Sequence, residues 1–226
     1  MQRVPEPELM EEDLQARAYA EADFEEPHSN FIKLFEQNFP SASMAGFVLD
    51  LGCGPGDISI RFARAFPRCS VHGVDGSEAM LNYGRLALGQ AADVQERVQL
   101  FKGLLPDLAL PRTRYDAVIS NSLLHHLHDP QVMWRTIGEF ATSATRVFIM
   151  DLIRPKSLDE ARKLVETYAA DEPALLQRDF FNSLLAAFEP AEIEEQLRHA
   201  GLKHLSLSVV SDRHAIIFGH DRRNRG

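Results

Sequence analysis

Short apolar runs alternate with segments of helical periodicity through the middle of the chain. Apolar runs of this length, bounded by glycine and polar residues, predict buried strands. The strands are expected near residues 47–51, 71–75, 98–101, 115–120 and 146–152. Strands that alternate with helices in this way form a parallel sheet with helices on both of its faces.

The segments that flank this core have a helical pattern. Residues 8–38 predict two helices with a break near Pro27, and the first would run from Glu8 to about Phe24. Residues 157–188 predict a helical insert with several aromatic side chains. A further helix is expected over 190–201, which starts with proline and acids and ends at glycine.

Two final strands, near residues 203–209 and 213–219, are joined by a short link that predicts an antiparallel hairpin. The whole pattern predicts an α/β fold of the doubly wound type, with a seven-stranded, mostly parallel sheet and an antiparallel C-terminal hairpin. The 226 residues are enough for one domain with its own core. Its expected parts are a helical N-terminal cap (1–45), the core (46–155), a helical insert on the substrate side (156–189), and the final helix and hairpin (190–220).

The charge of the chain argues against nucleic acid as a partner. There are 33 acidic residues against 24 lysines and arginines, a formal net charge of −9. Phosphate backbones require clustered basic charge, and the one such cluster is the tail 221–226. The acidic balance, and the lack of an apolar run of about 20 residues, also argue against a membrane location.

We expect a cytoplasmic protein, since the N-terminus lacks the apolar core of a secretion signal. The two cysteines do not form a metal-binding or disulfide framework. Cys53 is expected to pack as a small apolar residue, and Cys69 to be partly exposed. A bridge between them is not excluded, but a reducing compartment is the simpler interpretation.

The loop after the first strand carries the clearest chemical signal. Three alternating glycines, Gly52, Gly54 and Gly56, follow Asp50 directly after the strand. Few Cβ atoms hold a ligand away from such a loop, so backbone N–H groups can approach a small molecule at the carboxyl edge of the sheet. The dinucleotide fingerprint requires a third glycine three places after the second, and Asp57 stands there instead.

The second strand also ends in an acid, Asp75, which is positioned to accept two ribose hydroxyls of a bound nucleoside. This signal alone does not choose between nucleosides. An alternative role for Asp75 is that of a helix N-cap, although Ser77 is the better cap for the helix that follows.

Together these segments resemble the class I S-adenosylmethionine (SAM) methyltransferases, whose fold is Rossmann-like. The matching pieces are the DLGCGPG loop, VDGSEAML after the second strand, the strand and LHHL turn over 115–130, and the strand FIMDL over 148–152. The similarity is greatest to the broad group that includes quinone-biosynthesis C-methyltransferases and many small-molecule methyltransferases. It covers most of the chain and blurs after about residue 155.

The resemblance implies that the chain binds SAM and releases S-adenosylhomocysteine (SAH). The glycine loop would hold the methionine moiety, Asp75 the ribose, and the residues after Asp75 the adenine. Tyr19 would contact the cofactor or substrate, or simply pack at a helix–sheet seam. The implied cofactor contacts are Tyr19, Asp50, Gly52, Cys53, Gly54, Asp75, Gly76, Met80, Gly103, Leu104, Asn121 and Ser122.

One position departs from the family pattern. After the third strand many relatives have an acid that accepts a hydrogen bond from the adenine amino group, and here Leu104 stands in that segment. Leu104 cannot accept this bond, so backbone groups or Asp107 would have to serve.

The LHHL turn provides the candidate catalytic residues. Neutral imidazole exchanges protons near physiological pH, so His125, His126 and His128 are the obvious proton acceptors. We expect that adjacent His125 and His126 cannot both face one pocket, and that His125 and His128 share a side if the turn opens a helix. In related enzymes the second histidine lies near the methyl donor, which favours His126. A structural role for these histidines remains open, as does a role for Asp151, which is expected to pair with Arg154.

We expect no metal site, because no additional ligand shows matching spacing. The predicted function is methyl transfer from SAM to a small-molecule acceptor by a monomer or homodimer. Methyl transfer depends mainly on alignment and exclusion of water, so a general base is optional. One alternative is an NAD-dependent oxidoreductase, which the glycine spacing disfavours, and another is a non-catalytic SAM-fold binding module.

Overall fold

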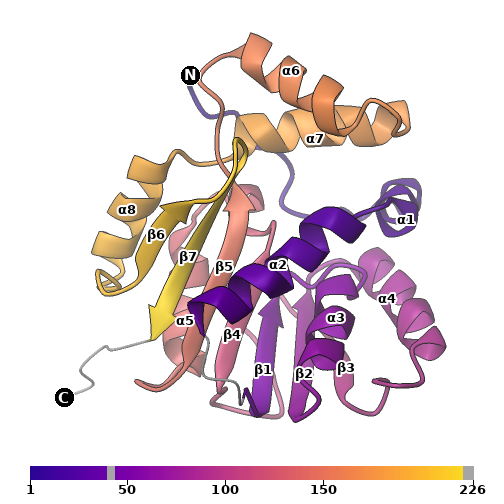
Figure 1. The fold of residues 1–226 in the computed structure, drawn as a ribbon, viewed down its shortest axis with the longest axis vertical. Helices are drawn as coiled ribbons and strands as arrows, with labels where there is room; N and C mark the ends of the chain where they lie inside the picture. The colour runs from indigo at the N-terminus through magenta and orange to yellow at the C-terminus, as the bar shows by residue number, and fades with distance from the viewer. Residues whose placement is uncertain (40–43, 221–226) are drawn as a thin grey trace.

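A seven-stranded sheet with the strand order β3-β2-β1-β4-β5-β7-β6 forms the centre of the molecule (Figure 1). All pairs are parallel except β5–β7 and β6–β7, which are antiparallel. The computed structural model describes residues 1–39 and 44–220, so the basic tail lies outside it. The strands are β1 Gly46–Leu51, β2 Cys69–Asp75, β3 Val98–Lys102, β4 Ala117–Asn121, β5 Arg146–Leu152, β6 Ser206–Val209 and β7 His214–His220. The predicted fold class is confirmed.

Helices cover both faces of this sheet. They are α1 Asp13–Glu21, α2 Glu25–Asn38, α3 Asp57–Ala65, α4 Glu78–Gln90, α5 Gln131–Phe140, α6 Leu158–Tyr168, α7 Ala174–Ala186 and α8 Pro190–His199, with a short 3₁₀ turn η1 over Leu124–His126. In Figure 1, α6 and α7 stack beyond the carboxyl end of β5, and the N-terminus lies beside them. No helix among the described residues is both long and apolar enough to cross a bilayer.

Side-chain alternation along the strands divides the core into two layers. Leu49 and Leu51 of β1 pack in the layer that contains Trp134 of α5 and Ile193 of α8. Val48, which points to the other face, packs in the layer formed by α2 and α3. The central strands are buried on both faces, as a parallel sheet between two helical layers requires.

Three predicted boundaries are wrong. The first helix begins at Asp13 and not at Glu8, since the residues before it have no regular secondary structure. The break between the first two helices falls at residues 22–24, and Pro27 lies inside the first turn of α2, where its missing N–H leaves no hydrogen bond unmade. The first of the two final strands begins at Ser206, because the preceding residues turn to bury Leu205 in the core.

Residues 1–10, which we call the N-terminal strap, cross the carboxyl edge of the sheet. The Arg3 guanidinium donates to the carbonyls of Ala186, His125 and Leu127 at 2.5, 2.8 and 3.0 Å. At the other end of the strap, Ser77 Oγ donates to the Met10 carbonyl at 2.6 Å. The strap therefore connects α7, η1 and the start of α4 across the region where sheets of this class bind ligands.

Candidate functional site

The glycine loop has a backbone that L residues rarely adopt. The φ angles of Gly52, Gly54 and Gly56 are +68°, +51° and +78°. A Cβ on Gly52 would meet the Leu123 side chain at 2.8 Å, whereas a Cβ on Gly54 would have nothing within 4 Å. Gly52 is therefore required for packing, and Gly54 faces open space.

A cavity of about 920 Å³ lies above this loop, between the sheet edge, the strap, α1 and α7. The sequence-predicted cofactor residues all line it, although they come from segments far apart in the chain. They are Tyr19, Asp50, Gly52, Cys53, Gly54, Asp75, Gly76, Met80, Gly103, Leu104, Asn121 and Ser122. His125 and His126 line the same cavity.

The Asp75 carboxylate connects the glycine loop with the segment that follows β2. It accepts hydrogen bonds from Gly54 N and Ser77 N, both at 2.8 Å. Burial raises the pKa of Asp75, and the backbone N–H donors oppose that shift. Ser77 caps α4, since its Oγ accepts from Met80 N at 3.2 Å. Asp75 is therefore not required as the cap and is placed at the cavity wall.

Asp50 supports the loop from below. Its side chain is 1% exposed and accepts a hydrogen bond from Ser59 Oγ at 2.6 Å. Burial and, to a smaller extent, the charge of Asp75 raise the pKa of Asp50 from 3.8 to about 7, against the lowering effect of the Ser59 hydrogen bond. The charged form is the unfavourable one at this position.

We predict that Asp50→Asn removes a pH-dependent loss of stability. A carboxyl whose pKa is raised on folding holds its proton more tightly in the folded state, so the unfolding free energy falls as pH rises from about 4 to about 7. Each pKa unit corresponds to ~1.4 kcal/mol, so the effect amounts to a few kcal/mol. Urea unfolding of both proteins at several pH values tests this. The unfolding free energy of the variant should rise relative to that of the native chain as pH increases. The same pH dependence in both proteins would contradict the prediction.

The N-terminal helices form one wall of the cavity. The Tyr19 ring lies 4.7 Å from the Phe24 ring, and burial, followed by the charge of Asp57, raises the pKa of Tyr19 to about 12. His28 Nδ1 lies 2.6 Å from Asp57 Oδ2, which also accepts from Arg61 Nε at 2.6 Å. Sequence reasoning missed this link between α2 and α3, since only Asp57 belongs to a recognised motif.

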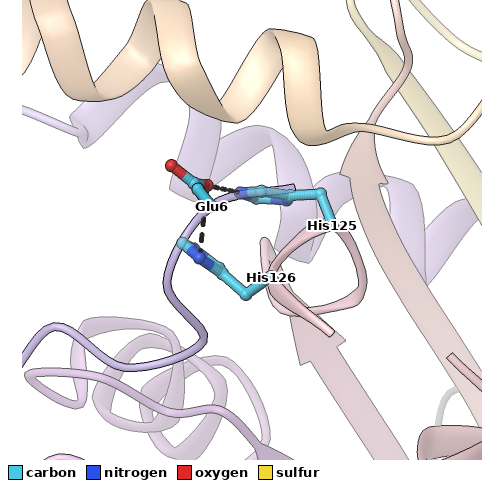
Figure 2. Close-up of side chains that lie close together, drawn as sticks. All are labelled: Glu6, His125 and His126. Atoms are coloured by element: carbon cyan, nitrogen blue, oxygen red, sulfur yellow. Dashed lines mark ion pairs between the residues drawn. The ribbon is translucent and has the colours of Figure 1, made fainter. Parts of the chain in front are cut away.

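The histidine turn differs from the prediction. His125 and His126 both point toward the carboxylate of Glu6 in the strap (Figure 2), and their ring centroids are 4.2 Å apart. The 3₁₀ geometry of η1 permits this, because the backbone turns sharply between the two residues. The expectation that adjacent histidines cannot share a pocket is wrong. His128 is exposed, and its backbone N–H donates to Glu8 at 2.7 Å.

The two histidines have opposite electrostatic environments. His125 Nδ1 lies 2.6 Å from Asp151 Oδ1. Burial lowers the pKa of His125, but the carboxylates of Asp151 and Glu6 outweigh it, so that the net shift is upward. Burial and the charge of His125 lower the pKa of His126 well below 6.5. Burial also raises the pKa of Glu6.

Asp151 pairs with His125. The pair with Arg154 that the sequence suggests does not form. The second oxygen of Asp151 accepts from Leu124 N at 2.7 Å, so the carboxylate holds both the ring and the turn. Arg154 instead lies 3.1 Å from Glu189 and 2.9 Å from Glu192. Asp151, at the end of β5, therefore holds η1 in position, and Arg154 pairs with the acids at the start of α8.

Two other expectations from the sequence are corrected. Cys69 is buried, because it begins β2 against α3; both cysteines are free, and Cys53 packs as expected. Asp107 is not among the residues that line the cavity, so the backbone around Gly103 remains as the source of polar contacts there. Leu104 is 57% exposed at the cavity rim.

The helical insert lines the remaining wall of the cavity. Phe180, Asp179 and Ser183 of α7 line it, while Phe181 packs within the α6–α7 pair and Phe188 in the main core. Gln15 Nε2 donates to Asp179 Oδ2 at 2.8 Å and connects α1 with α7. Of the aromatic side chains in the insert, those of Tyr168 and Phe180 therefore line the cavity.

The comparisons with known proteins agree with this geometry. Residues 48–143 match the family model described as "Methyltransferase domain". This segment is a methyltransferase domain. A related chain is an uncharacterized methyltransferase of Mycobacterium tuberculosis, 26% identical over 48% of this chain and 51% of that protein. Another is the ubiquinone/menaquinone biosynthesis C-methyltransferase UbiE of Syntrophotalea carbinolica, 28% identical over 49% of this chain and 46% of that protein.

The chain thus spans about half the length of these curated relatives. The family-model match falls on the sheet core, from β1 through α5. Among solved structures, a SAM-dependent methyltransferase from Aquifex aeolicus aligns with a TM-score of 0.66 at 15% identity, over 90% of this chain and 96% of that chain. This likeness supports the fold, including the parts outside the family model.

Proposed function

We propose that this chain transfers a methyl group from SAM to a small-molecule acceptor and releases SAH. The observation that carries the proposal is the single cavity that joins the glycine loop and Asp75 to the paired histidines of η1. Cavities of several hundred Å³ with few convergent polar groups are typical of small-molecule sites. At about 920 Å³ this cavity has room for a nucleoside and a second, smaller molecule.

The residues present fit the cofactor. Gly54 leaves its Cβ position open toward the cavity, as a loop that cradles a ligand requires. Asn121 Oδ1 is buried and has no hydrogen-bond partner among the described residues, so it is available to a ligand amine. The glycine loop and Asn121 would hold the methionine moiety, Asp75 the ribose, and Gly103 with Leu104 the adenine.

SAM supplies a methyl group already activated on a sulfonium. The protein's contribution is then to align the acceptor and exclude water. The strap and α7 close the cavity from above, and Asp151 fixes the orientation of His125. His126 and His125 line the cavity and are our candidates to receive a proton from the acceptor.

A small molecule fits the acceptor side better than a macromolecule. The strap and α7 cover the histidine turn and leave His125 2% exposed, so a bulky substrate would have to displace the strap or α7. The net charge of −9 also disfavours nucleic acid. The relative UbiE is named for quinone biosynthesis, which supports a small acceptor.

Transfer of a labelled methyl group tests the activity. The chain would be incubated with methyl-labelled SAM and the small-molecule fraction of a cell extract, with the Asp75→Ala variant as the control. We expect label in new small molecules with the native chain only. Binding of SAH without any transfer would favour the non-catalytic binding module instead.

A further inference from the structure

One carboxylate of the strap and two imidazoles of η1 meet at a position that has no recognisable ligand spacing in the sequence. Glu6 Oε1 lies 3.7 Å from His125 Nε2 and 3.3 Å from His126 Nδ1. One ligand atom from each residue can be chosen so that all lie within 4.8 Å of one another. Figure 2 shows the two rings approaching the Glu6 carboxylate from the same turn.

We propose that Glu6, His125 and His126 bind a divalent transition-metal ion of the zinc type. Zinc is bound at about 2.0–2.1 Å by imidazole nitrogen and carboxylate oxygen, so neighbouring ligand atoms in a tetrahedral site lie about 3.3 Å apart. The two distances from Glu6 Oε1 are close to that edge length. Two imidazoles with one carboxylate suit zinc or iron, and do not suit magnesium or calcium, which prefer oxygen ligands.

Groups around the cluster already hold these ligands in position. The Asp151 carboxylate faces His125 Nδ1 at 2.6 Å, so a proton shared on that side leaves the Nε2 lone pair toward Glu6. Metal-binding histidines commonly have such a carboxylate behind them. On the other ligand, Ser183 Oγ donates to Glu6 Oε1 at 2.9 Å.

The environment of His126 is not explained by an ion pair with Glu6 alone. His126 Nδ1 is buried and has no hydrogen-bond partner among the described residues. The ring hydrogen-bonds the backbone of Pro7, which has no N–H and can act only as an acceptor. The donor is then Nε2–H, and the Nδ1 lone pair points toward Glu6. A lone pair facing a carboxylate is unfavourable, and a cation between them removes the conflict.

The position of the cluster suggests what the ion does. His125 and His126 line the cavity, so the remaining coordination positions would face the acceptor. With the ion bound, both histidines would act as ligands instead of as proton acceptors. An acceptor hydroxyl bound to the metal has a lowered pKa, which would make its oxygen a better nucleophile. This role rests on the proposed methyl transfer, whereas the binding of the ion does not. The ion would also tie the strap to η1.

Titration of the metal-free, untagged chain with Co²⁺, followed by visible absorption, tests the proposal. We expect one equivalent to bind with the spectrum of a four- or five-coordinate site and to be displaced by Zn²⁺. Glu6→Gln and His126→Gln should each weaken binding at least about tenfold. His199→Gln, which removes an exposed histidine on α8, should leave it unchanged.

The same proteins would be titrated with SAH. Retained SAH affinity shows that the variants are folded and separates the metal site from the cofactor site. If the native chain binds no Co²⁺ or Zn²⁺, or if Glu6→Gln and His126→Gln bind as tightly as the native chain, the metal site is overturned. Either result leaves the proposed methyl transfer to be judged on its own test.

Discussion

Replacing Asp75 with alanine will weaken the binding of SAH by at least about tenfold. The carboxylate stands at the carboxyl end of β2, at the cavity wall, where it can accept two ribose hydroxyls. Hydrogen bonds to a charged group contribute about 1.5–3 kcal/mol, and ~1.4 kcal/mol is a factor of ten in affinity. The substitution also releases Gly54 N and Ser77 N, which fix the glycine loop against α4. Calorimetric titration with SAH measures the loss.

A control at the amino end of the strands separates the loss of a ligand contact from a general loss of stability. Asp116 is an exposed acid whose carboxylate accepts from Phe47 N at 2.8 Å, so Asp116→Ala also removes a carboxylate-to-backbone bond. It lies outside the cavity lining and should leave the SAH affinity unchanged. Equal affinities in the native chain and Asp75→Ala would remove Asp75 from the nucleoside site.

We also expect Gly54→Ala to weaken SAH binding by at least about tenfold, because the new methyl group would occupy space next to the ligand. The φ of Gly54 is +51°, and its Cβ would meet no protein atom within 4 Å. The substitution therefore costs about 1 kcal/mol of backbone strain without a clash in the free protein. Thermal unfolding measures the loss of stability from strain, and SAH titration of the same sample measures the loss of affinity.

Gly201 offers a matched control for this strain. It follows α8 with φ +71°, and a Cβ there would also meet nothing within 4 Å. Gly201→Ala should lower stability by a similar amount and leave SAH binding intact. If both variants bind SAH as the native chain does, the open face of Gly54 is not the cofactor side of the loop.

The cofactor half of the site could be predicted because its signals are local. The glycines and Asp75 each lie at the end of a strand, and parallel strands bring their carboxyl ends to one edge. The structure places these residues around one cavity for that reason.

The acceptor half could not be predicted in the same way. Glu6 meets the histidines through a strap with no periodic pattern, held by Arg3 and by its contact with Ser183. The 3₁₀ turn, which allows both His125 and His126 to face Glu6, has no clear sequence signal. Proximity in the sequence predicts a pair between Asp151 and Arg154, whereas the fold brings His125 of η1 closer to Asp151.

The central claim is that the cavity above the glycine loop binds SAM. Calorimetric titration of the native chain with SAH, with NADH as a parallel ligand, tests it most directly. We expect micromolar or tighter binding of SAH and no measurable binding of NADH. Failure to bind SAH, or a preference for NADH, would contradict the assignment of the glycine loop and of the function built on it.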